Sequence, residues 1–269
     1  MIGHGSLFGA ARSMAAGLAA ARRQPRSLEQ TAHRQWPVPD RAWLMAQTWS
    51  DLLFAHWRVD AEVLRDVVPA SIPIDEFDGS AWIGVTPFRV EGFRLHRSPP
   101  IPVVQAFPEV NVRTYATIGD RPGIFFFSLD TASRFAVEGA RRIYRVPYFH
   151  ARQRIARTGG EVAFASERTQ RDGPPAELDI RYRPEGDSFE PAPGTLEHFL
   201  TERYCLYTLD SGGGVLRGDI HHAPWRIAPA GADLARNTMG RQVGLELEGA
   251  PLAHLAERRD VLFWTLQPV

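Results

Sequence analysis

Phe107-Pro108-Glu109-Val110-Asn111-Val112-Arg113-Thr114-Tyr115 is the stretch that best indicates how this chain folds. Side chains alternate between the two faces of a strand, so the polar row contains Glu109, Asn111, Arg113 and Tyr115. A solvent-facing strand would usually carry Thr, Lys or Ser in that row. An acid, an amide, a guanidinium and a phenol instead suit the wall of a polar cavity that binds and protonates a small molecule. An edge strand with an exposed salt bridge fits the same pattern.

The composition limits the classes of function. At 269 residues and 44% hydrophobic content, the chain can bury a sizeable core as one large domain or two small ones. It has 31 basic and 31 acidic residues, so no net charge attracts nucleic acid, and we expect no such partner. All the basic residues are arginine. The sequence therefore excludes a Schiff-base lysine and a phosphate-binding P-loop.

Cysteine content and hydropathy predict a soluble, cytoplasmic protein. Cys205 is the only cysteine, so no intramolecular disulfide can form, and its apolar surroundings favour a core residue over a nucleophile. No apolar run approaches the ~20 residues needed to span a bilayer.

The first forty residues differ in composition from the rest. Five arginines oppose one acid, Glu29, within the first 34 residues. This composition predicts a basic, partly helical or disordered extension over residues 1–40. No long linker interrupts the apolar pattern that begins at Trp43, so residues 41–269 are predicted to form a single domain.

Short runs of alternating or apolar residues predict about nine or ten strands. In addition to residues 107–115, these runs are residues 81–90, 124–129, 148–157, 161–168, 176–183, 204–209, 215–221 and 261–266. Glycines at 159–160 and 212–214 predict hairpin turns. Short connections favour antiparallel pairing, and a sheet of this many strands tends to close on itself.

A few short helices are predicted between the strands. Asp60 and Thr195 are candidate N-caps, and residues 130–144 change to a helical period. A last helix is predicted around residues 233–237 or 251–257. The fold class is therefore mainly β (α+β), a closed antiparallel barrel with a few flanking helices.

Histidines offer weaker candidates for chemistry. His221 shares a predicted strand face with Asp219 and is the candidate proton-transfer histidine, although a structural role is the more ordinary one. A metal site could be assembled only from the distant His56, His150 and His221, because no metal-binding spacing is present. We expect neither a metal nor a cofactor.

The strongest candidate site combines a carboxylate, arginines and a tyrosine. Glu109 and Tyr115 are the candidate proton carriers, because burial and nearby cations can tune the pKa of a glutamate. The candidate substrate-binding residues are Asn111, Arg113, Arg141, Arg142 and Arg203. Arginine stays charged and binds carboxylates through two parallel hydrogen bonds, so a small carboxylate ligand is the expected partner. A buried ion-pair network that braces the barrel is the alternative.

Several motifs resemble a known superfamily. Trp57-Arg58-Val59-Asp60, residues 64–69 and residues 72–76 resemble the pattern near the start of acetoacetate decarboxylases. Residues 53–57, 78–84, 107–115, 128–130, 202–207 and 222–225 are similar to the YqjF-like uncharacterised branch of that superfamily. The resemblance extends over roughly residues 43–266.

The resemblance implies a closed, cone-like antiparallel barrel with a polar cavity. Decarboxylases of the superfamily use a Schiff-base lysine within a lysine pair, which corresponds here to Arg141-Arg142. Arginine cannot form the imine, so the resemblance does not extend to that mechanism. Another active-site arginine of the superfamily corresponds to Ser50, and Glu109 is the nearest substitute for its catalytic glutamate.

Together, these observations predict an enzyme that acts on a small carboxylate or keto acid without a Schiff base. Enolisation, hydration or dehydration, and carbon–carbon lyase chemistry all suit the candidate residues. A non-catalytic small-molecule-binding or structural barrel is the alternative. The sequence leaves the oligomeric state open, and a homo-oligomer is compatible with it.

Overall fold

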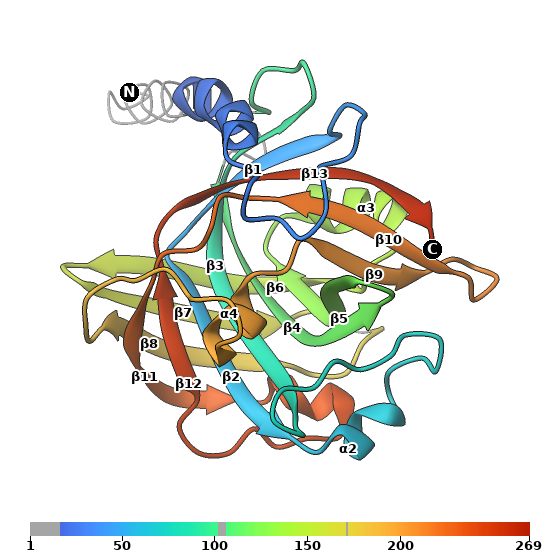
Figure 1. Ribbon diagram of the computed structural model, residues 1–269. Helices are drawn as coiled ribbons and strands as arrows, with labels where there is room; N and C mark the ends of the chain where they lie inside the picture. The colour runs from blue at the N-terminus through green and yellow to red at the C-terminus, as the bar shows by residue number, and fades with distance from the viewer. Residues whose placement is uncertain (1–16, 102–105, 171) are drawn as a thin grey trace.

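The computed structural model describes residues 17–101, 106–170 and 172–269 and consists mainly of strands (Figure 1). The beginning of the predicted N-terminal extension, residues 1–16, lies outside this range. The strands are β1 (Met45–Ser50), β2 (Leu52–Val59), β3 (Ala81–Leu95), β4 (Ala106–Ile118), β5 (Arg121–Thr131), β6 (Tyr148–Thr158), β7 (Glu161–Arg168), β8 (Glu177–Pro184), β9 (Cys205–Leu209), β10 (Val215–His221), β11 (Ile227–Asn237), β12 (Leu252–Ala256) and β13 (Arg259–Pro268).

The strand pairings close two rings that share three strands. The sheet order is β1-β13-β10-β9-β5-β4-β3-β2-β12-β11-β8-β7-β6, with additional pairings β1–β3 and β5–β6. The first extra pairing closes a small ring of β1, β13, β10, β9, β5, β4 and β3. The second closes a large ring of β5, β4, β3, β2, β12, β11, β8, β7 and β6. Most pairings are antiparallel, but β5 pairs in parallel with both β6 and β9.

The position of β4 gives its two faces different surroundings. β4 lies between β3 and β5, in the wall common to both rings. Because strand side chains alternate, one row of β4 faces the small ring and the other faces the large ring. Val110 and Val112 belong to the apolar row and are fully buried. Glu109, Asn111 and Arg113 belong to the opposite row and are also buried.

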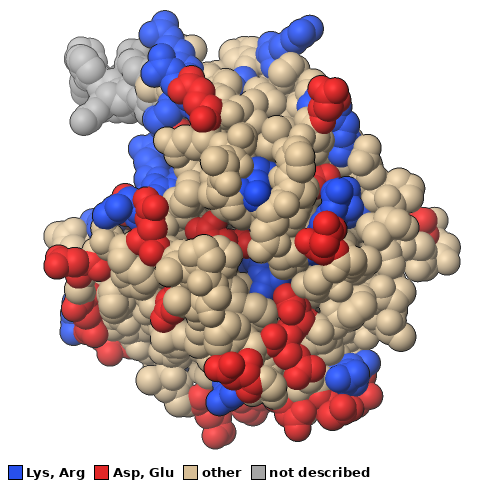
Figure 2. Space-filling model, viewed as in Figure 1, with Lys and Arg blue, Asp and Glu red and all other residues tan. Residues whose placement is uncertain are grey.

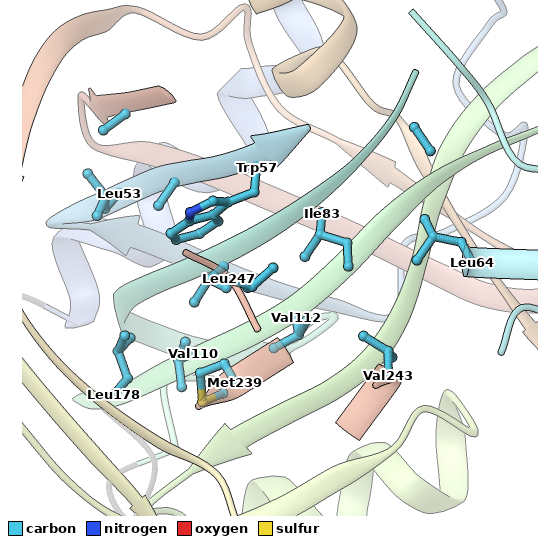
Figure 3. Packing of buried hydrophobic residues seen from close by; sticks show 14 of the residues in the cluster. Leu53, Trp57, Leu64, Ile83, Val110, Val112, Leu178, Met239, Val243 and Leu247 are labelled. Atoms are coloured by element: carbon cyan, nitrogen blue, oxygen red, sulfur yellow. The ribbon is translucent and has the colours of Figure 1, made fainter. Parts of the chain in front are cut away.

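The large ring contains the main hydrophobic core (Figure 3). Val110 and Val112 of β4 pack there with residues of β2, β3 and β8 and with the segment after β11, including Leu53, Ile83, Leu178, Met239 and Leu247. This packing fixes the register of β4, because a shift by one residue would bring its charged row into the apolar core.

Short helices connect or cover the strands. They are α2 (Ala61–Arg65), α3 (Arg134–Ile143), α4 (Leu196–Thr201) and the 3-10 helices η1 (Gln24–Glu29) and η3 (Met239–Val243). The predicted N-caps are confirmed, since the side chain of Asp60 accepts from the backbone N–H of Glu62 and that of Thr195 from His198. Ser133 caps α3 in the same way. α3 packs against β5 and β6, and its Val137 lies in a buried cluster with Ile220 of β10 and Phe263 of β13.

Some predicted elements were wrong. Residues 233–237 and 251–257 do not form the predicted helix, since they lie largely in β11 and β12. β11 pairs with β8, and β12 pairs with β2, so tertiary pairing overrides the local helical spacing there. The sequence also gave no clear signal for β1 and β2, which are almost continuous and are separated only at Asp51, where φ is 52°.

Residues 17–36 pack on the small ring. Arg23 forms an ion pair with Asp260 of β13, at 2.5 Å between Nε and Oδ2. The buried Gln24 donates to the carbonyl oxygen of Gly92 in β3, and the indole of Trp36 donates to Asp219 of β10. This part of the predicted extension is therefore held by specific contacts with three strands.

On the side shown in Figure 2, arginine and acidic side chains are mixed over much of the surface, and acidic side chains predominate along the lower edge. None of the helices among the described residues is long and apolar enough to cross a membrane.

Candidate functional site

A small cavity lies inside the small ring, against the polar row of β4. Its volume is about 60 Å³. Glu109, Asn111 and Arg113 line one wall. The other lining residues come mainly from the remaining strands of the ring and from α3: Met45, Gln47, Trp49, Phe88, Ile124, Phe126, Leu129, Ala140, Tyr144, Val146, Tyr148, Leu206, Ile220 and Phe263. Three adjacent polar side chains of one strand therefore face an otherwise largely apolar enclosure.

Arg113 is a buried cation without an acidic partner. Its side chain belongs to a residue that is 5% exposed, and it forms no salt bridge with any described residue. The Nε and Nη2 atoms have no hydrogen-bond acceptor within the described part of the chain. The guanidinium lies 5.1 Å from the ring centroid of Phe54, which offers a cation–π contact but no acceptor. A buried charge without a partner is costly, so this arrangement favours an anionic ligand.

Glu109 is a buried acid whose proton affinity is raised. Burial raises the pKa of Glu109 to about 8, and Asp130 adds to the shift, whereas the Tyr148 hydroxyl opposes it. That hydroxyl donates to Oε2 of Glu109 at 2.9 Å. A carboxyl with a pKa near 8 exists in both protonation states around neutral pH. Such a group can act as a general acid or a general base.

Asn111 and Gln47 add amide groups to the lining of the cavity. Asn111 lies between Glu109 and Arg113 in the row, and its Oδ1 has no donor among the described residues. Gln47 of β1 accepts the indole N–H of Trp49 through Oε1, at 2.7 Å. This contact leaves the Gln47 amide nitrogen available as a donor. The cavity can therefore offer amide hydrogen bonds to a carbonyl or hydroxyl oxygen.

We expect Tyr148→Phe to raise the pKa of Glu109 above that of the wild type. The hydroxyl donates to the ionised carboxylate and so stabilises the charged form, and its loss leaves only the effects that disfavour ionisation. The titration can be followed by NMR of proteins with carboxyl-labelled glutamate. A Glu109 pKa that is unchanged or lower in the variant contradicts the assigned hydrogen bond.

The other two candidate proton carriers do not line the cavity, although the Tyr115 ring centroid lies 6.0 Å from the Arg113 guanidinium. The hydroxyl of Tyr115 donates to the Leu200 carbonyl oxygen at 2.8 Å and accepts from His56 Nε2 at 2.6 Å, and its ring packs outside the cavity lining. His221 donates from Nε2 to the Ser27 carbonyl oxygen. Burial lowers the pKa of His221 to about 4, so its ring is neutral near pH 7. Neither residue lines the cavity.

The three remaining candidate arginines are also outside the cavity lining. Arg141 on α3 donates to the Tyr148 carbonyl oxygen at 2.6 Å, so it holds the start of β6. Arg142 is exposed and lies 3.6 Å from Glu138. Arg203 is buried but paired, because its Nη1 donates to Asp75 Oδ2 at 2.6 Å. Of the predicted substrate-binding residues, the structure brings together only Asn111 and Arg113, beside Glu109.

Sequence reasoning missed Tyr148, Gln47 and Tyr144. Tyr148 begins a predicted strand, but its place beside Glu109 depends on the parallel pairing of β5 with β6, which the local pattern does not reveal. Gln47 had a usable signal, because it is a lone amide in the mostly apolar segment 43–49. Tyr144 lies at the C-cap of α3, where a buried aromatic residue resembles ordinary packing.

The histidines considered for a metal have separate partners. His56 donates to Tyr115, His150 contacts the Thr169 hydroxyl, and His221 contacts Ser27. The described residues contain no group of three or more His, Cys, Asp or Glu side chains arranged to hold a metal ion.

Comparisons with known proteins identify relatives over most of the chain. Residues 46–260 match the model of the DUF2071 family, described as uncharacterized conserved proteins. The uncharacterized protein YqjF of Bacillus subtilis (strain 168) is 42% identical over 231 residues, which cover 86% of this chain and 94% of YqjF.

Solved structures with a similar fold are more distant in sequence. The enduracididine biosynthesis enzyme MppR with bound HEPES superposes with a TM-score of 0.59 at 10% identity, covering 89% of this chain and 98% of MppR. An acetoacetate decarboxylase-like enzyme from Sphingomonas wittichii RW1 has a TM-score of 0.57 at 14% identity and the same two coverages. The acetoacetate decarboxylase of Legionella pneumophila has a TM-score of 0.56 at 10% identity, covering 87% of this chain and 92% of that enzyme. At these identities the similarity shows the fold, and the predicted acetoacetate decarboxylase-like fold is confirmed.

Proposed function

The chain belongs to the DUF2071 family of uncharacterized conserved proteins, and we propose that it is an enzyme acting on a small keto acid by acid–base chemistry. The observation that carries the proposal is that Arg113, whose Nε and Nη2 have no acceptor among the described residues, lines the same cavity as Glu109. In this assignment Arg113 binds the carboxylate of the substrate. Glu109 exchanges protons with the carbon next to the keto group.

The spacing along β4 supports separate roles for the two residues. Positions 109 and 113 are four residues apart in one strand, which places their Cα atoms ~13 Å apart. The two side chains can therefore contact different parts of one small molecule. Since no ion pair joins them among the described residues, each retains its capacity for a ligand. This arrangement favours the ligand site over an internal ion-pair brace.

The proposed step is an enolisation. The ionised Glu109 accepts a proton from the α-carbon, the electron pair of the broken C–H bond forms a C=C double bond to the keto carbon, and the π pair of the carbonyl moves to the keto oxygen. An amide N–H of Asn111 or Gln47 stabilises the enolate oxygen. Return of the proton from Glu109 restores the keto acid, so exchange of Glu109 with solvent transfers a solvent hydrogen to carbon. The same enolate is the first intermediate for dehydration or lyase chemistry.

Two features of the comparisons agree with a keto acid ligand. One structure of the fold neighbour MppR holds pyruvate, at a TM-score of 0.58, and another holds the condensation product of pyruvate and imidazole 4-carboxaldehyde. The chain has no lysine to form an imine with such a ligand. The proposed chemistry therefore uses the enol directly rather than a Schiff base.

Proton exchange in deuterated water tests this proposal. We expect the protein to exchange the α-protons of at least one short 2- or 3-keto acid, at a rate that rises with pH toward a plateau above about 8, where Glu109 is ionised. Glu109→Gln should lower the rate by about 10²–10⁴-fold. NMR integration of the α-proton signals measures the exchange.

A non-catalytic barrel predicts a different result. In that case keto acids bind, but none exchanges its α-protons faster than in buffer, and Glu109→Gln changes only the stability of the protein. That outcome rejects the enzyme proposal and favours a small-molecule-binding protein.

A further inference from the structure

A second, apolar pocket adjoins the cavity. Its volume is about 140 Å³. Five residues line both spaces: Met45, Gln47, Ala140, Tyr144 and Tyr148. The two spaces are therefore adjacent, with the polar groups of the cavity at one end and the apolar pocket at the other.

The walls of this pocket suit an apolar group. The remaining lining residues are Leu44, Phe93, Leu95, Ile101, Phe107, Phe135, Ala136, Gly139 and Ile143, none of which carries a polar side chain. Phe135, Ile143 and Leu95 are among the large hydrophobic residues that the protein leaves exposed. An apolar ligand group in the pocket would cover part of this surface.

Helix α3 leaves space on the side that faces the pocket. Ala136, Gly139 and Ala140 are its small residues there, between the larger Phe135 and Ile143. A Cβ added at Gly139 meets no atom within 4 Å. The helix thus forms a wall with room beside it rather than a closely packed contact.

One face of β4 lines both the apolar pocket and the cavity. Phe107 continues the row of Glu109, Asn111 and Arg113 and lines the apolar pocket. The same face of one strand therefore runs from an apolar pocket, past a proton-carrying acid, to an unpaired cation. A molecule with its carboxylate at Arg113 would extend past Glu109 toward Phe107.

We propose that the substrate of this site is a keto acid with an apolar tail, and that the pocket between α3, β1 and β3 binds the tail. This inference rests on the proposed function, because it takes the carboxylate end of the ligand to be at Arg113. A pocket of this kind favours acids with an extended aliphatic substituent over pyruvate-sized acids. Gly139 and Ala140 of α3 then determine how long a tail the site accepts.

Calorimetric titration of the full chain with 2-oxobutanoate, 2-oxohexanoate and 2-oxooctanoate tests the inference. We expect each added methylene to tighten binding by up to about fourfold until the pocket is filled. Gly139→Leu should fill the pocket and weaken 2-oxooctanoate binding by about tenfold or more, while 2-oxobutanoate binding stays within about twofold. Leucine has a higher helix propensity than glycine, so the variant should fold.

Glu138→Leu is the matched control, because it adds the same side chain to α3 at a neighbouring exposed position. It should bind all three acids like the wild type. Affinity that does not depend on chain length, or an equal loss for all three acids in Gly139→Leu, overturns the inference while the proposed function stands. Failure of every acid to bind the wild type overturns the proposed function as well.

Discussion

Arg113→Met should make the ligand-free protein more stable, by about 1–3 kcal/mol in the free energy of unfolding. Most substitutions of buried residues destabilise a protein. Here the wild-type side chain buries a cation whose Nε and Nη2 have no acceptor among the described residues. Methionine has a similar length, fills irregular space and carries no charge. The gain in stability is expected because the desolvation cost of the guanidinium is no longer incurred.

Arg168→Met is the control for this prediction. Arg168 is also buried, but it donates from Nε and Nη2 to the two carboxylate oxygens of Asp130, at 2.6 and 2.7 Å. Its removal leaves a buried carboxylate unpaired and should cost about 3–5 kcal/mol. Urea unfolding of both variants and the wild type measures the difference. If Arg113→Met also loses several kcal/mol, Arg113 is a structural residue and not a vacant ligand group.

Glu109→Gln should remove a large pH dependence of stability. The pKa of Glu109 is about 8 in the folded protein and near 4.5 when the chain is unfolded. Between these values the folded state retains a proton that the unfolded state releases, so stability falls as the pH rises. The contribution is fully present below about pH 4.5, is lost as the pH rises toward 8, and changes no further above that value. Its size is on the order of 5 kcal/mol.

The difference between wild type and Glu109→Gln isolates this contribution. Burial also raises the pKa of Asp130 and of Glu202, but these groups are present in both proteins and largely cancel in the comparison. Urea unfolding from about pH 5 to pH 9 should show the wild type losing stability relative to the variant as the pH rises. A constant difference, or one of opposite slope, means that Glu109 is not the proton-holding group assigned here.

Much of the fold followed from local pattern. The alternation at residues 107–115 predicted β4 (Ala106–Ile118) and the separation of its rows, because a strand between two packed interiors must alternate. Helix caps and glycine turns were also predictable, because a few neighbouring residues determine them, as at the N-cap Asp60 and in the β6–β7 hairpin. The failures at residues 233–237 and 251–257 have the opposite cause. Their strand conformation is imposed by β8 and β2, which are distant in sequence.

The candidate site was predictable only along one strand. Glu109, Asn111 and Arg113 could be grouped because the two-residue period is local. Tyr115 continues the same period, but α4 packs over that end of the row and the Leu200 carbonyl oxygen accepts a hydrogen bond from its hydroxyl. Tyr148 and Gln47 could not be placed, since their positions depend on ring closure through the β5–β6 and β1–β3 pairings.

The structure places Arg141 and Arg142 away from the cavity. Arg141 and Arg142, where the resemblance to the decarboxylases predicted the position of a lysine pair, lie on α3 outside the cavity lining. Arg141 holds the Tyr148 backbone and Arg142 is exposed. The proposed chemistry therefore takes place beside β4, where Glu109 and Arg113 line the same wall of the cavity.

Calorimetric titration of wild type and Arg113→Met with one short 2-keto acid at neutral pH measures whether Arg113 binds the carboxylate of a ligand. We expect saturable binding to the wild type and a loss of about tenfold to a hundredfold or more in affinity for the variant, since a charge-assisted hydrogen bond contributes about 1.5–3 kcal/mol. Equal affinities of the two proteins for a keto acid that binds the wild type would contradict it.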